Sequence, residues 1–225
     1  MPPKILIPLA VLSLASCNEY YTPPSTSLPM TGGSSGAVQD NPHARPTVRF
    51  PARVAIARIE PAYDSFRLVS GGGSENPEHA AKVTALPGVR GMVPLGRVAL
   101  ATRVNSYREL DREALKLGAD LLAVYRIETE RRSSDAFEPL SILSLGLAPT
   151  VSNQITTVAT LVVRDARTGY IYGVLEERAE SKGVTMAMDI SSAQRRAAKR
   201  TEKEAMDRLM ERLPGFWNGV LAKGK

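Results

Sequence analysis

The chain has 225 residues, with 29 lysines and arginines against 23 aspartates and glutamates, and a pI near 9.6. Its one cysteine and two histidines exclude a disulfide framework and a zinc site of ordinary spacing. The formal net charge of +6 indicates a basic surface, which attracts anionic partners of many kinds and by itself selects none of them.

An apolar run close to the N-terminus is the first element. Residues 5–15 read ILIPLAVLSLA and follow Lys4. The run is shorter than the roughly 20 residues that cross a bilayer. A basic start, a short apolar stretch and small residues before a cleavage point are typical of a secretory signal peptide. Because Ala15 and Ser16 supply the small residues, we expect residues 1–16 to be removed as a signal peptide.

Cys17, the only cysteine, stands directly after this predicted cleavage point. The segment Leu14-Ala15-Ser16-Cys17 resembles the lipobox of bacterial lipoproteins. The resemblance implies that Cys17 carries fatty acyl chains such as palmitate and that the chain is a lipid-anchored protein. Two or more acyl chains hold a protein stably at a bilayer, whereas one chain does so only marginally. The alternative is an ordinary signal peptide with a cysteine nearby.

Asn18 follows the cysteine, at the position where lipoproteins retained in the inner membrane usually carry aspartate. We therefore expect a bacterial outer-membrane location that faces the periplasm, rather than the inner membrane. Nucleic acid is not expected as a partner in that compartment. The expected partners are the lipid bilayer, reached through acylated Cys17, and an envelope protein or a second copy of this chain.

Residues 17–47 are rich in proline, serine, threonine and glycine and show no apolar periodicity. Such a segment cannot bury enough apolar area to offset the entropy of ordering it, so we predict a flexible tether. Residues 32–36 match the G-x-S-x-G pattern of a hydrolase nucleophile. That pattern indicates a catalytic serine only between a strand and a helix, and here it lies in low-complexity sequence.

The folded part is predicted to begin with a strand at residues 48–60, whose apolar residues indicate cover on both faces. A short helix is expected next, capped by Ser74 or Asn76 and running to about Ala85. A second strand is expected near Val89–Pro94.

A longer helix follows, with Ser106 as its predicted N-cap and Glu109 completing a capping box. Its apolar face consists of Leu110, Ala114 and Leu117. Gly118 is the predicted C-terminal stop. Residues 119–130, ADLLAVYRIETE, then indicate a central strand because they are almost continuously apolar at the start.

A β-hairpin is predicted from two strand-like runs, residues 155–164 and 170–177, on either side of the turn Asp165–Gly169. Before it, Arg131–Ser134 is expected to form a polar turn. The apolar segment 139–149, PLSILSLGLAP, is either a loop that covers the sheet or a lip that faces a partner or the membrane.

The last element is predicted as a long helix, capped by Ser191 or Ser192. Its apolar residues recur at helical spacing: Ala198, Ala205, Met206, Leu209, Met210 and Leu213. Pro214–Gly215 is expected to end it, so that Phe216 and Trp217 fold back onto the sheet.

These elements predict one α/β (α+β) domain over residues 48–222. It would contain a mixed sheet of about five strands, including the C-terminal hairpin, with three helices packed over it.

Two stretches, LGADLLAVYRIETE (117–130) and TTVATLVVRDARTGYIYG (156–173), resemble the small α/β domain of bacterial envelope lipoproteins. The similar groups are the curli-secretion lipoprotein, the activators of penicillin-binding proteins and the rhombotarget lipoproteins. The resemblance implies a binding or assembly module of the envelope and brings no catalytic residue. The paired amphipathic hairpins from which the curli-secretion family builds its pore have no counterpart in this sequence.

Residues that could carry chemistry are few. His43 lies in the predicted tether and His79 stands alone on a predicted helix, so neither metal ligation nor a catalytic triad is indicated. Asp120 and Asp165 could act as paired carboxylates, but a strand start and a hairpin turn explain both better. We expect no catalysis, no cofactor and no metal.

Two classes of function therefore stay open. The first is a lipid-anchored periplasmic binding or assembly module. The second is an envelope protein that binds a small ligand or hydrolyses it, which requires a deep pocket with converging polar groups. The sequence offers only Tyr125, Arg126, Tyr170 and Tyr172 as candidates for such a pocket.

Overall fold

The computed structural model describes residues 43–62, 65–69, 76–96, 103–104, 106–135, 150–186 and 190–224. In chain order its elements are β1 (Ala52–Ala62), β2 (Ser65–Leu68), α1 (Pro77–Thr84), β3 (Val89–Pro94), β4 (Arg103–Val104), α2 (Tyr107–Lys116), β5 (Leu121–Asp135), β6 (Thr150–Asp165), β7 (Ile171–Met186) and α3 (Ile190–Lys223).

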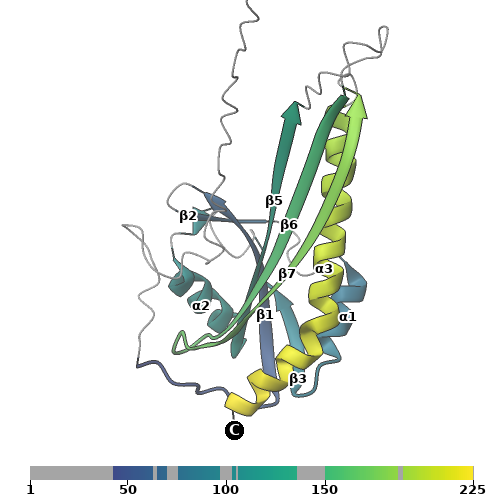
Figure 1. The fold of residues 1–225 in the computed structure, drawn as a ribbon. Coiled ribbons are helices and arrows are strands. Elements are labelled where there is room, and N and C mark those ends of the chain that lie inside the picture. Colours follow the sequence, from purple (N-terminus) through teal and green to yellow (C-terminus); the bar gives the residue numbers. More distant parts are fainter. Residues whose placement is uncertain are drawn as a thin grey trace, which may run out of the picture.

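Strands of this part of the chain pair into a seven-stranded mixed sheet in the order β4-β2-β1-β5-β6-β7, and β3 also pairs with β1. The β1 strand is parallel to β3 and β5, and the other neighbours are antiparallel. Helices α1 and α3 lie on one side of the sheet and α2 on the other (Figure 1). The predicted α/β class, with a mixed sheet and three helices, is confirmed; β2 and β4 are strands that the sequence did not indicate.

Alternation along β5 builds a core on each face of the sheet. Leu121 and Ala123 belong to the apolar cluster beneath α1 and α3, whereas Leu122 and Val124 belong to the cluster beneath α2. These strand residues are almost fully buried, as the predicted central strand requires. Both faces of the sheet are therefore apolar where the helices cover it.

The hairpin β6–β7 turns at Gly169, whose φ of 76° suits glycine. The Asp165 carboxylate accepts hydrogen bonds from the backbone N–H groups of Arg167 and Thr168 at 2.8 and 3.1 Å. It also accepts from the backbone N–H and the hydroxyl of Thr47, each at 2.8 Å. The last residues of the predicted tether are therefore bound to this turn and belong to the fold.

Several predicted boundaries are wrong. The hairpin strands were predicted at 155–164 and 170–177, but β6 begins at Thr150 and β7 runs on to Met186. Arg131–Ser134 forms no turn, because β5 continues to Asp135 and pairs with β6 throughout. Helix α3 begins at Ile190, so Ser191 and Ser192 lie inside it rather than at its cap. Pro214–Gly215 does not end α3, which runs on to Lys223. Segment 139–149 lies outside the described residues.

Trp217 explains why α3 continues past its proline. A proline inside a helix costs about 3 kcal/mol, because it removes a hydrogen bond and crowds the preceding turn. The Trp217 side chain is buried and its Nε1 donates to the Pro87 carbonyl oxygen at 2.9 Å. Burying an indole contributes roughly 5 kcal/mol at ordinary transfer values. The packing thus outweighs the proline, and Trp217 contacts the core from within the helix.

A buried ion pair lies on the α2 side. Arg164 Nη2 of β6 donates to Asp111 Oδ2 of α2 at 2.8 Å, and both side chains are less than one-tenth exposed. The Arg164 guanidinium lies 5.1 Å from the ring centroid of Tyr107. Burial is the largest influence on Asp111 and raises its pKa to about 6, although Arg164 acts in the opposite direction.

This pKa predicts the sign of a pH effect on stability. The folded state holds the Asp111 proton more tightly than the unfolded state does. The stability that protonated Asp111 contributes is therefore present at pH 4 and is lost as the pH rises to about 6. Chemical denaturation should show that the free energy of unfolding of the native protein falls between pH 4 and pH 6.5, relative to that of Asp111→Asn. The expected fall is roughly 1.4 kcal/mol for each unit by which folding raises the pKa of Asp111.

Asp207→Asn serves as the control for this measurement, because hydrogen bonds and charge from Lys203 and His79 lower the pKa of Asp207. The stability that ionised Asp207 contributes to the native protein should be present above the ordinary carboxyl pKa and should be lost as the pH falls. A parallel pH dependence of the two variants relative to the native protein would contradict the assignment.

Candidate functional site

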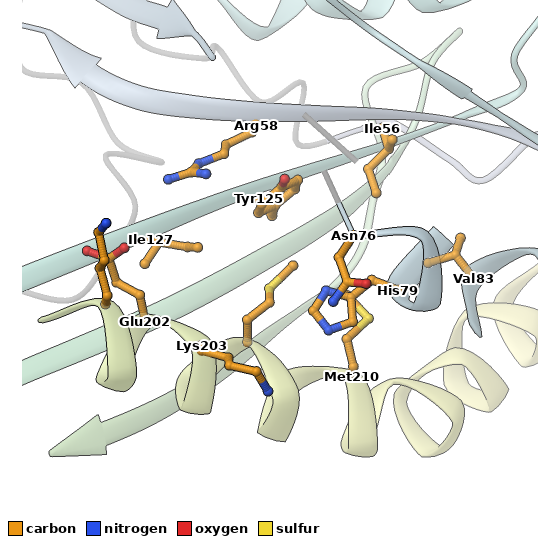
Figure 2. A pocket seen from close by; sticks show the side chains of 12 residues that line it. Ile56, Arg58, Asn76, His79, Val83, Tyr125, Ile127, Glu202, Lys203 and Met210 are labelled. Carbon is orange, nitrogen blue, oxygen red and sulfur yellow. The ribbon is translucent and has the colours of Figure 1, made fainter. Parts of the chain in front are cut away.

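A pocket of about 240 Å³ lies between the sheet and the two helices α1 and α3 (Figure 2). We call it the α1–α3 pocket. It is lined by Ile56 and Arg58 of β1, Tyr125 and Ile127 of β5, His79 and Val83 of α1 with the capping residue Asn76, and Lys199, Glu202, Lys203, Met206 and Met210 of α3.

Short local rules place these side chains. Ile56 and Arg58 lie two residues apart on β1 and therefore face the same side of the sheet. Asn76 begins α1, because its side-chain oxygen accepts from the backbone N–H of Glu78 at 2.9 Å. This cap sets where α1 starts and so directs His79 toward α3.

The four lining residues Lys199, Lys203, Met206 and Met210 form one stripe along α3, at spacings of four, three and four residues. Two lysines occupy the N-terminal half of the stripe and two buried methionines the C-terminal half. The opposite wall changes in the same direction: Arg58 lies at the end of the pocket near Glu202, and Ile56 lies toward Val83 (Figure 2). The pocket is therefore lined by charged side chains at one end and by apolar side chains at the other.

His79 ties α1 to α3 at this site. Its Nε2 lies 3.2 Å from Asp207 Oδ1, and the other carboxylate oxygen of Asp207 accepts from Lys203 Nζ at 2.5 Å. These two partners lower the pKa of Asp207. The histidine that the sequence left without a role thus positions a helix at the wall of the pocket.

Glu202 is held by a row of hydroxyl groups that crosses from the sheet to α3. Thr129 donates to Glu202 Oε1 at 3.1 Å and lies 3.0 Å from the Thr157 hydroxyl. Thr157 lies 2.8 Å from the Thr201 hydroxyl, and both are fully buried. Thr201 also donates to the Ala198 carbonyl oxygen at 2.9 Å. The row holds the Glu202 carboxylate at the charged end of the pocket.

Of the four side chains proposed from sequence, one lines this pocket. Tyr125 lies in its wall, whereas the buried Arg126 follows on the opposite face of β5 and pairs with Glu128 Oε1 at 3.2 Å. Tyr170 and Tyr172 lie elsewhere, edge to face with ring centroids 5.3 Å apart. Burial is the main reason that the pKa of Tyr172 rises to about 12.

Asp120 and Asp165 do not form a carboxylate pair. Asp120 Oδ2 accepts from the Arg53 backbone N–H at 2.9 Å and from Arg90 Nη2 at 3.0 Å. Asp165 is occupied by the backbone of its own turn and by Thr47. Both carboxylates therefore have the structural roles expected from their positions.

Most of the pocket was not predicted from the sequence. Lys199, Lys203, Met206 and Met210 do share a helical stripe that the spacing alone could have shown. Arg58 and His79 gave no comparable signal, because their approach to α3 depends on tertiary packing. Among the described residues no group of three or more histidines, cysteines, aspartates and glutamates could hold a metal ion. No described helix has the length and apolarity to cross a membrane.

These features define an α/β domain with a small, polarised pocket between a sheet and two helices. No family model matches the chain, and no curated protein matches it.

Several solved structures are loosely similar. A dodecamer of a PelC point variant from Paraburkholderia phytofirmans is 11% identical over 77% of this chain and 93% of its own, with a TM-score of 0.31. Lipoprotein GNA1162 from Neisseria meningitidis is 12% identical over 66% and 99%, with a TM-score of 0.28. Protein XCC0632 of the DUF330 family from Xanthomonas campestris is 12% identical over 84% and 93%, with a TM-score of 0.28.

One of these neighbours is described as a lipoprotein. TM-scores near 0.3 are too low to assign the chain to any of these groups. The finer resemblance, to curli-secretion, penicillin-binding-protein-activating and rhombotarget lipoproteins, stays a prediction.

The hydroxyl row gives a test of how the pocket is built. Thr157→Val keeps the shape of the side chain but leaves the half-buried hydroxyl of Thr129 and the buried hydroxyl of Thr201 with one fewer partner. We expect the free energy of unfolding to fall by about 1–3 kcal/mol, measured by chemical denaturation. Thr156→Val is the matched control, because the neighbouring residue faces the other side of β6 and should change stability little. Equal effects would exclude a role for the row.

Proposed function

We propose that this chain is a lipid-anchored binding protein of a bacterial envelope, attached through acylated Cys17 and facing the periplasm from the outer membrane. The position of the single cysteine behind the apolar run supports the anchor. Secretion signals and acyl chains together account for residues 1–17 without requiring a helix that spans the bilayer.

The α1–α3 pocket is the observation that carries the binding role. A small-ligand function requires converging polar groups around a largely apolar cavity, and this pocket combines buried Ile56, Tyr125 and Met210 with cationic and acidic side chains. At about 240 Å³ it is slightly smaller than most ligand sites, so it suits a small ligand or a single chain of a larger one.

We propose binding without catalysis. The groups that the sequence offered for acid–base chemistry have structural partners: His79 contacts Asp207 at the pocket wall, Asp120 accepts from backbone and Arg90, and Asp165 accepts from the hairpin turn. The expected association with an envelope protein, or with a second copy of the chain, also stays a prediction.

The anchor is tested by Cys17→Ser, which removes the thiol that would be acylated. We expect the variant to lose incorporation of labelled palmitate and to leave the membrane fraction on sedimentation. A Ser16→Ala variant, with the cysteine intact, should behave as the native protein. Retention of both label and sedimentation by Cys17→Ser would contradict lipid anchoring at this residue.

The binding role is tested by purifying the full chain from detergent-solubilised membranes and analysing both small molecules and proteins by mass spectrometry. We expect a small molecule that is retained by the native protein and absent from Ile127→Trp, because the larger side chain would occupy the pocket. A protein partner that both forms retain equally, with no small molecule in either, would contradict the pocket as the binding site and favour another face of the domain.

A further inference from the structure

The predicted tether joins the folded domain at one end of the long hairpin. Thr47 is bound to the β6–β7 turn through Asp165, and the Thr168 hydroxyl donates to the Arg45 carbonyl oxygen at 2.9 Å. Each strand of the hairpin has 16 residues and is therefore about 50 Å long. Because an anchor at Cys17 would be joined to this end, it would hold this end closer to a bilayer than the opposite one.

The first described residues cross this end of the molecule, from the hairpin turn to the C-terminal end of α3 (Figure 1). Phe50 contacts Trp217 of α3 edge to face, with ring centroids 6.2 Å apart. Lys223 Nζ of α3 donates to the Tyr172 carbonyl oxygen of β7 at 2.7 Å. Segment 43–50, the β6–β7 turn and the last turn of α3 therefore form one surface, which we call the tether-end surface.

Exposed cations gather on the tether-end surface. Four of them come from its three segments: Arg45, Arg49, Arg167 and Lys223. None of these four lines the α1–α3 pocket. They are spread over the outside of the domain, so they suit an extended anionic layer better than a small anion.

Carboxylates offset only part of this charge. Asp165, buried beneath the hairpin turn, offsets one of the four cations. Asp40, which precedes Arg45 in the sequence, would offset at most one more. Three ion pairs near this end add no net charge: Arg90–Asp120, Lys116–Glu113 and Arg164–Asp111. The formal charge of the tether-end surface is therefore positive.

We propose that the tether-end surface docks on an anionic lipid bilayer, with the long hairpin directed away from the membrane. Anionic head groups attract lysine and arginine near the membrane surface, and each such residue strengthens binding about fivefold. The inference rests on the proposed function, because the anchor at Cys17 supplies the nearby bilayer. Charge and position thus select the same partner for this surface.

The test uses the full chain carrying Cys17→Ser, so that docking is measured without the anchor. The protein is sedimented with phosphatidylcholine vesicles, with and without phosphatidylglycerol, at low ionic strength. We expect binding to the phosphatidylglycerol vesicles to be at least roughly tenfold tighter than to the neutral ones. Added salt should remove the difference, because it screens charges at the surface.

A triple variant removes three charges from the tether-end surface: Arg45→Gln, Arg49→Gln and Arg167→Gln. These side chains are exposed and form no ion pair with another described residue, so the fold should be kept. We expect the variant to bind the anionic vesicles at least roughly tenfold more weakly than the chain with Cys17→Ser alone.

The matched control removes three exposed charges from the far ends of β5 and β7 and the start of α3: Arg131→Gln, Lys182→Gln and Arg195→Gln. The net charge changes by the same amount in both triple variants. The control should bind the anionic vesicles nearly as tightly as the chain with Cys17→Ser alone.

Trp217, the only tryptophan, gives a second readout because it lies at the docking end of the domain. The native anchored chain is reconstituted into vesicles whose head groups carry dansyl. We expect energy transfer from Trp217 to be greater when phosphatidylglycerol is present. The Arg45, Arg49 and Arg167 triple variant should lose this increase, and the matched control should keep it.

Three results would overturn the proposal: no binding to either kind of vesicle, equal binding to both kinds, or equal weakening by the two triple variants. The proposed function fails separately. Labelled palmitate on Cys17→Ser would contradict the anchor, since docking cannot supply an acyl label. Retention of the same molecules by the native protein and Ile127→Trp would contradict the pocket.

Discussion

The pairing register of β5, β6 and β7 is the constraint on which the rest of the structure depends. It sets Ala159 of β6 between Ile127 and Glu177, and every second residue from there on faces α3. A shift of one residue would turn the alternate set outward and expose the core. The same register aligns Thr129 with Thr157, and so creates the hydroxyl row that reaches Glu202. Core and pocket therefore depend on one ladder of backbone hydrogen bonds.

The pocket exists because two helices share one face of this sheet without closing over it completely. Helix α3 runs beside the long strands, and α1 lies against it at the lower part of the sheet (Figure 1). His79 and Asp207 hold the two helices together, and Trp217 fixes the end of α3 to the turn after α1. Met206 and Met210, which fill space less rigidly than branched residues, line the cavity. A cavity at this position is thus a consequence of how the helices are fastened.

The anchor and the pocket would support an envelope role together. Acyl chains on Cys17 would keep the domain within reach of the membrane. The chain enters the fold near Thr47, which is bound to the β6–β7 turn. A binding pocket on a domain held in this way would meet its ligands at or near a lipid surface.

Much of the architecture was predictable because it follows from local rules. The strand at Val89–Pro94, the helix that ends before Gly118 and the hairpin around Gly169 were all recognisable from apolar spacing and glycine positions. Ser106 occupies the predicted N-cap position, although its side chain makes no capping hydrogen bond. The elements that were mistaken are those in which a distant partner changed the local preference. Arg131–Ser134 reads as a turn until β6 pairs with it.

The class of fold and the expected anchor at Cys17 follow from the order of residues alone, because an apolar period and a short N-terminal pattern need no information from the rest of the chain. Only the tertiary structure determines that α3 continues through Pro214 and that Arg58, His79 and Lys199 line one cavity. These outcomes depend on packing between residues far apart in the chain. Burial of Trp217 offsets a helix-breaking residue, and the ladder of β5–β7 determines which side chains face α3.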